Sequence, residues 1–120
     1  MNKTHKDFQD IFNELSALAI SDKIVFMEML LFNFTITGRA IWSEGQQSDS
    51  IKVEAFKWLN ELSHRIWNIL FDLRRGENND SITRLYDHMK LYAEQSHLLS
   101  GHLAATTVMT FKSFEDRKQH

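Results

Sequence analysis

The sequence contains no cysteine and no proline, and only four of its 120 residues are glycine. Without cysteine there is no disulfide framework, no thiolate metal site and no cysteine nucleophile. Glycine and proline interrupt helices, so their scarcity predicts long helices joined by few loops. Lys and Arg number 14 against 16 Asp and Glu, so the chain lacks the basic excess of a dedicated nucleic-acid binder.

Long hydrophobic runs are missing as well. The most apolar run, Ile24 to Ile36, spans 13 residues and contains Glu28 and Asn33, so it is shorter than the ~20 residues that a membrane-spanning helix needs. No apolar stretch follows the charged first residues, which is unlike a secretory signal. We therefore expect a cytoplasmic protein without a membrane partner. The Walker, Rossmann and His-Glu-x-x-His motifs of common enzymes are absent too, and no small-molecule substrate is evident.

What the chain does contain is helical periodicity. Apolar residues make up 42% of the sequence and recur at steps of three and four residues, which is typical of amphipathic helices. The stripes predict helices over about 6–19, 22–44 and 51–75, and a last helical segment that starts near Ile82. Gly101 leaves open whether this last segment is one helix or breaks before a short fifth helix over about 102–115.

Short polar loops between long helices imply antiparallel neighbours. The sequence therefore predicts an all-α fold, an antiparallel up-down-up-down four-helix bundle. The bundle forms a single domain over 1–120, with frayed ends at 1–4 and 116–120.

Local signals predict how the helices begin and end. Gly76 lies where a helix needs a left-handed terminal residue. The residue types that cap helices predict three starts, at Ser21 or Asp22, at Asp49 or Ser50, and at Asp80 or Ser81.

One charged residue interrupts the apolar second helix. Glu28 and Arg39 are eleven residues apart and return to nearly the same helical face, so we expect them to form an ion pair. The alternative is that Glu28, among apolar neighbours, has a raised pKa and acts as a general acid.

Two Glu-x-x-His patterns, Glu61–His64 and Glu94–His97, resemble those of ferritin-like di-iron bundles. On a helical wheel these side chains turn away from the apolar stripes, so we expect two surface pairs, with no metal and no cofactor. The segment from His97 to Gly101 also resembles the phosphate-accepting motif of histidine phosphotransfer domains, with Ser100 in place of a lysine. A metal-binding or histidine phosphotransfer bundle is thus the alternative function.

Surplus apolar surface is the most unusual feature. The third and fourth predicted helices carry large apolar residues away from their main stripes, and a helix in one bundle buries only about one face. Another part of the chain, a partner helix or a second copy of the chain would have to cover them. The predicted contact surface comprises Val53, Phe56, Trp67, Phe71, Leu91, Leu98 and Met109.

Two segments are similar to a known family. The segment Leu85-Tyr86-Asp87-His88-Met89 resembles the Leu-Tyr-x-Tyr-Met segment of the flagellin-specific export chaperones, although His88 replaces the second tyrosine. The run Met29 to Asn33 is similar to a Met-Leu-Tyr-Asp-Gly-like run of that family, and the likeness extends over about 21–93. The N-terminal tyrosine-bearing segment of the family is missing. The resemblance implies a cytoplasmic helical bundle that wraps the helical C-terminal segment of an export substrate in apolar grooves.

These patterns together predict a function. We expect a non-enzymatic protein-interaction module that binds a partner helix, or a second copy of itself as a homodimer, through apolar helix faces.

Overall fold

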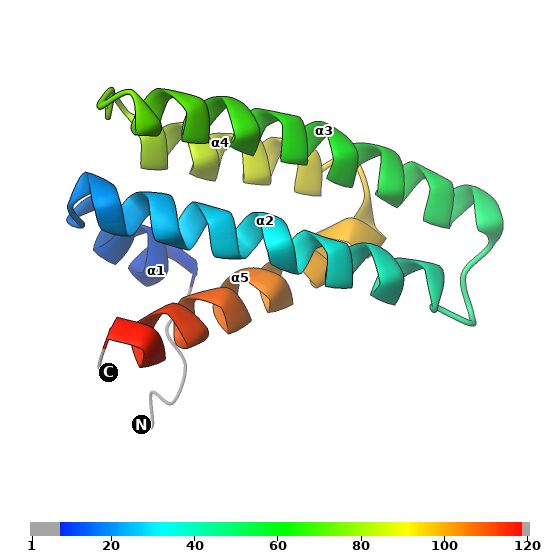
Figure 1. Ribbon diagram of the computed structural model, residues 1–120. Helices are drawn as coiled ribbons and strands as arrows, with labels where there is room; N and C mark the ends of the chain where they lie inside the picture. The colour runs from blue at the N-terminus through cyan, green and yellow to red at the C-terminus, as the bar shows by residue number, and fades with distance from the viewer. Residues whose placement is uncertain (1–7, 119–120) are drawn as a thin grey trace.

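The computed structural model describes residues 8–118, which form five α-helices and no strand (Figure 1). Most residues of this part of the chain are therefore helical, as the scarcity of glycine and proline predicts. The helices are α1 (Phe8–Ser16), α2 (Ile20–Trp42), α3 (Asp49–Arg74), α4 (Ser81–Ala93) and α5 (His97–Lys118).

The helices lie in two layers. In Figure 1, α2 and α3 form a long antiparallel hairpin nearest the viewer, and α4 lies behind α3. The shortest dimension of the molecule is 24 Å, which is the thickness of two helices of about 10–12 Å each. From α2 to α5 successive helices alternate in direction, an arrangement compatible with the predicted bundle. The short α1 packs against α4 and α5.

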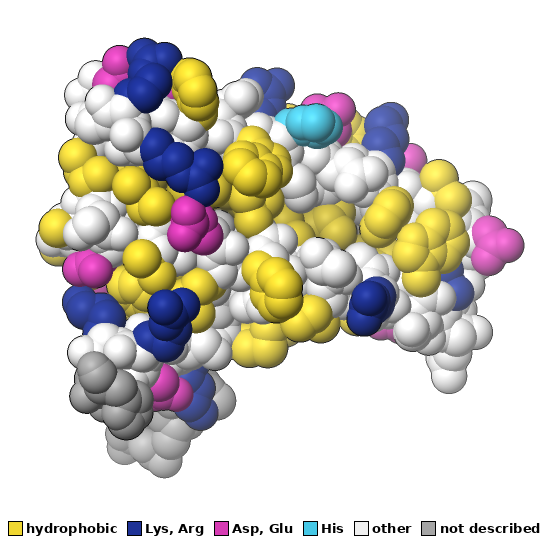
Figure 2. All heavy atoms as spheres, in the orientation of Figure 1, with side chains coloured by type: hydrophobic (Ala, Val, Ile, Leu, Met, Phe, Trp, Pro, Cys, Tyr) yellow, Lys and Arg dark blue, Asp and Glu magenta, His cyan; other side chains and the backbone are white. Residues whose placement is uncertain are grey.

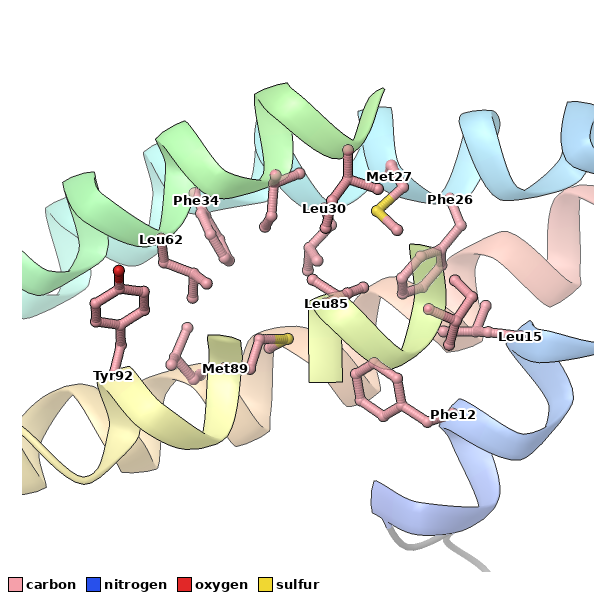
Figure 3. Packing of buried hydrophobic residues seen from close by; sticks show 14 of the residues in the cluster. Phe12, Leu15, Phe26, Met27, Leu30, Phe34, Leu62, Leu85, Met89 and Tyr92 are labelled. Carbon is pink, nitrogen blue, oxygen red and sulfur yellow. The ribbon is translucent and has the colours of Figure 1, made fainter. Parts of the chain in front are cut away.

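The core lies between the layers (Figure 3). Helix α2 contributes Phe26, Met27, Leu30 and Phe34 to this core, all fully buried or nearly so. The core residues of the other helices that Figure 3 labels are Phe12, Leu15, Leu62, Leu85, Met89 and Tyr92. The buried apolar residues of α1, α3 and α4 recur at steps of three and four, so the apolar stripes of these helices point inward.

The C-terminal part of the chain differs from its predicted form. The last helical segment breaks at residues 94–96, before Gly101, because Ser96 Oγ accepts a hydrogen bond from the Leu99 backbone N–H at 3.1 Å and so caps α5. Gly101 lies inside α5. The fifth helix is therefore 22 residues long rather than short, and it includes residues 116–118, which were expected to fray. The other predicted frayed residues, 1–4 and 119–120, lie outside the described residues.

The N-terminal ends of α2 and α3 differ from their predicted positions. Helix α2 begins after Ala19 with no side-chain cap, so the predicted cap at Ser21 or Asp22 is wrong. Helix α3 is capped by Ser48, one residue before the nearer of the two predicted caps, and Ser48 Oγ accepts from the Ile51 backbone N–H at 3.4 Å.

The loop between α3 and α4 uses two left-handed residues. Gly76 has φ 84°, as its position predicts. Asp80 stands at the N-cap position of α4 with φ 54°, and its side chain makes no capping hydrogen bond. Ser81 Oγ instead donates to Asn78 Oδ1 at 2.9 Å, which fixes the loop before the helix begins.

Polar side chains join α2 to α5 in the interior. Asn33 Nδ2 donates to Thr110 Oγ1 at 2.8 Å, and the hydroxyls of Thr37 and Thr106 are 2.6 Å apart. Thr107 Oγ1 is buried and has no hydrogen-bond partner among residues 8–118. Side chains of α5 therefore cover the inner side of α2, and they match its polar atoms as well as its apolar ones.

By length and composition alone, α2 is long and apolar enough to cross a membrane. The 13-residue run considered above is shorter than the helix, which extends to 23 residues. Eight of its residues are buried inside the protein, and a core helix of a soluble protein passes the same test.

Candidate functional site

A groove of about 950 Å³ runs along the outer side of the hairpin between α2 and α3. Apolar side chains gather between these two helices on the face shown in Figure 2. Phe32 and Trp42 line the groove from α2, and Phe56 and Trp67 line it from α3. The buried Phe34 of α2 also lines it, so five large aromatic side chains lie around one open depression.

Three of these aromatic side chains are largely uncovered. Phe32 is 72% exposed, Trp67 53% and Trp42 45%, whereas Phe56 is half-buried. Single exposed apolar residues are common, but a contiguous patch of them marks an interaction surface. These rings therefore form one apolar patch in a single groove rather than scattered surface residues.

Gly38 determines the shape of one end of the groove. A Cβ atom at this position would lie 2.9 Å from Phe56 Cε1, which is closer than two carbon atoms approach. The missing side chain lets the Phe56 ring lie against the backbone of α2, with its centroid 5.7 Å from that of Trp42. Phe56 consequently forms the floor of the groove here.

A charged cluster marks the other end. Arg74 Nη2 donates to Glu28 Oε2 at 2.6 Å, and the Arg74 guanidinium lies 5.8 Å from the centre of the Trp67 ring. Both charged side chains are close to half exposed, so the ion pair contributes at most about 1 kcal/mol.

The predicted pair between Glu28 and Arg39 is therefore wrong. The two residues share a helical face, but eleven residues separate them by about 16 Å along the axis, which no side chain spans. The antiparallel α3 brings Arg74 to Glu28 instead. Arg39 lines the groove and is exposed, with no ion-pair partner between residues 8 and 118.

The structure brings together only part of the contact surface predicted from the sequence. Phe56 and Trp67 line the groove. The other five predicted residues lie outside its lining: Val53 and Phe71 are exposed on α3, Leu91 is exposed on α4, Met109 is exposed on α5, and Leu98 is half-buried on α5. The role of all seven in binding stays a prediction.

Sequence reasoning missed the half of the groove that α2 supplies. Because α2 is apolar nearly all round, none of its faces stands out by hydrophobicity. The signal that could have found it is charge: after the first turn of α2, its charged residues Glu28 and Arg39 fall on one face, and that face is the exposed one. The uncharged polar residues Asn33 and Thr37 contact α5 instead. Phe32 lies within the same stripe.

A second hollow, of about 1050 Å³, lies where the loop after α2 approaches the start of α5. Most of the residues that line it are polar or charged types, among them His97, and the apolar Leu98 lines it as well. His102 Nε2 lies 3.0 Å from Glu44 Oε2, which ties α5 to that loop.

The residues of the metal-binding and phosphotransfer alternatives are on the surface. Glu61, His64, Glu94 and His97 are all exposed. Within the described range there is no group of three or more His, Asp or Glu side chains that could hold a metal ion. These alternatives stay predictions.

The surroundings of His88 on α4 shift its pKa. Its ring stacks on Tyr92 with the centroids 6.4 Å apart, and it is half-buried. Burial lowers the pKa of His88 below its usual value, and the nearby positive charges of Arg65 and Arg84 lower it further.

No family model, no curated protein and no solved structure matches this chain.

Proposed function

We propose that this protein is a non-enzymatic protein-interaction module that binds an apolar helix, from a partner or from a second copy, in the groove between α2 and α3. Helices α2 to α5 act as its scaffold, a four-helix bundle. The observation that carries this proposal is the set of three largely exposed aromatic rings, Phe32, Trp42 and Trp67, in one groove.

The physical basis is the cost of leaving these rings in water. Fully burying a large apolar side chain is worth about 1.5–3 kcal/mol, so covering several partly exposed rings supplies a substantial part of a binding free energy. An amphipathic helix covers such a groove with apolar residues spaced three and four apart. Thr35, Asn60 and Ser63 add polar atoms to the lining, so the groove can also bind hydrogen-bonding groups at the edge of such a helix.

An export-chaperone-like protein is a narrower form of the same proposal. The run that resembles the flagellin-specific export chaperones, Met29 to Asn33, lies on α2 and places Leu31 and Phe32 in the groove lining. In this form, the occupant is the helical C-terminal segment of an export substrate.

The test compares two double variants with the wild-type protein. Phe32→Asp with Trp67→Asp places two charges in the groove, and the matched control, Ile51→Asp with Val108→Asp, places two charges on exposed apolar positions of α3 and α5 outside the groove lining. We expect all three proteins to keep their helical circular dichroism. Self-association and co-purifying proteins are expected to be lost from the groove variant and kept by the control. Equal association of all three proteins, or of none, would contradict the proposal.

A further inference from the structure

One stripe of α2 is self-complementary. Glu28, Phe32, Thr35 and Arg39 all line the groove, and all four are exposed. They lie within about 60° of one another around the helix axis. Glu28 and Arg39 are equally far from the midpoint between residues 33 and 34, and so are Phe32 and Thr35.

Such a stripe fits a second copy of itself when the two helices run in opposite directions. A two-fold axis through the midpoint places Glu28 of each copy opposite Arg39 of the other, which forms two ion pairs. It also places the large Phe32 ring of each copy opposite the small Thr35 side chain of the other, so that the two surfaces are complementary in shape on both sides of the axis.

We propose that the groove between α2 and α3 binds the α2 helix of a second copy of this chain, antiparallel about this axis, with Glu28 of each copy paired to Arg39 of the other. This inference rests on the function proposed above and names the occupant of the groove. Each α2 then lies in the groove of its partner, and the four helices of the two hairpins form the interface.

The charges of one copy agree with this arrangement. Arg39 has no ion-pair partner among the described residues, although it lies in an apolar groove that a bound helix would dehydrate. Glu28 binds Arg74 through Oε2 alone, so Oε1 can accept from a second arginine. The dimer supplies each unpaired arginine with a carboxylate, and it leaves the ion pair within each copy intact.

The exposed apolar area of the groove also agrees with a dimer. Full burial of an aromatic side chain removes about 150–250 Å² from water, so covering the exposed parts of Phe32, Trp42 and Trp67 removes on the order of 300 Å² per copy. A stable pair needs about 800 Å² from each partner. Three rings therefore supply more than a third of the requirement, and the remainder of the two hairpins can supply the rest.

Charge reversal tests the pairing. In Arg39→Glu both charged positions of the stripe are acidic, and in Glu28→Arg both are basic, so each homodimer acquires two like-charge contacts. An equimolar mixture restores two opposite-charge contacts in the heterodimer. Sedimentation velocity over a concentration series is expected to show a wild-type dimer and a dissociation constant raised at least about tenfold for each variant alone. The mixture is expected to return close to the wild-type value.

Controls separate this pairing from general effects of charge. Glu61→Arg and Lys112→Glu make the same kinds of change at exposed positions outside the groove, and we expect both to dimerise as the wild type does. Circular dichroism checks that every variant keeps its helices.

Each contrary result overturns a different statement. A wild-type protein that stays monomeric excludes a second copy as the occupant of the groove. The proposed function is then decided by the separate test with the groove and control variants. Variants that dimerise like the wild type place the dimer interface elsewhere. Two monomeric variants that fail to associate when mixed exclude the antiparallel register. A dimer that survives Phe32→Asp with Trp67→Asp excludes the groove as the interface.

Discussion

The two sides of α2 carry similar residues and have different surroundings. On the inner side Phe26 and Leu30 are fully buried and Phe34 is 4% exposed, whereas on the outer side Phe32 is 72% exposed. The inner side also has matched polar groups, because Asn33 and its neighbours find hydroxyls on α5. On the outer side Arg39 finds no ion-pair partner within residues 8–118. Apolar composition alone therefore does not separate the core face of α2 from its exposed face.

The sharpest test of this difference removes one large apolar side chain from each side of α2. Leu30→Ala leaves a cavity in the core and is expected to lower the free energy of unfolding by about 2–5 kcal/mol. Phe32→Ala removes an exposed ring and is expected to change it by less than about 0.5 kcal/mol. Urea unfolding followed by circular dichroism, at a protein concentration low enough to keep subunits apart, measures both. Similar losses for the two variants would mean that the groove is part of the core.

The polar groups of the inner side provide a second test. Thr37→Val removes the partner of the Thr106 hydroxyl and leaves that group buried, so we expect a loss of about 1–3 kcal/mol in unfolding free energy. Thr107→Val removes a buried hydroxyl that has no partner, so a gain of about 1 kcal/mol is expected. The same urea titration compares them. A loss at Thr107 equal to that at Thr37 would show that its hydroxyl does have a partner.

A third test concerns the floor of the groove. Alanine is more favourable than glycine inside a helix by about 0.8–1.0 kcal/mol, so Gly38→Ala should stabilise α2 by this amount once nothing crowds the new methyl group. We expect that full gain in a Phe56→Ala background and a smaller gain or a loss with Phe56 present, because the methyl group meets the ring. A double-mutant cycle of unfolding free energies measures the difference. Equal effects in both backgrounds would mean that Phe56 does not lie against Gly38.

The smallest expected effect comes from His88, which is half-buried and so lies between the buried inner side and the exposed outer side of α2 in its access to water. The pKa of His88 is lowered in the folded state. The His88 side chain of the unfolded chain therefore binds a proton as the pH falls through about 6.5, whereas that of the folded protein binds one only at a lower pH. This contribution to stability is present above that pH and is lost below it. His88→Gln should therefore make the unfolding free energy fall less steeply on acidification. Urea titrations of both proteins at several pH values check this, and parallel curves would contradict it.

Much of the helix plan follows from the sequence. The helix predicted over about 51–75 is found as Asp49–Arg74, because its single apolar stripe and the polar segments beside it leave few alternatives. The sequence left open whether the last segment breaks at Gly101, and the break lies at residues 94–96 instead. No glycine or proline marks it, and the cap depends on one hydrogen bond at Ser96.

The candidate site was only half predictable. Phe56 and Trp67 stand out on α3 because they lie away from an amphipathic stripe, which is a local property. The contribution of α2 depends on which of its apolar faces α5 covers, and the pairing of Glu28 with Arg74 joins residues far apart in the chain. The ion pair between these two residues leaves no periodic signal in either segment.

The positions of the three tryptophans have a further consequence. All of them lie on α2 and α3, and two, Trp42 and Trp67, line the groove. The third, Trp58, lies outside its lining, with its ring centroid 5.3 Å from that of Tyr92. The ultraviolet emission of this protein is therefore an intrinsic reporter of the groove: when an apolar surface fills it, two indoles leave water and the emission moves to shorter wavelengths, with no label attached.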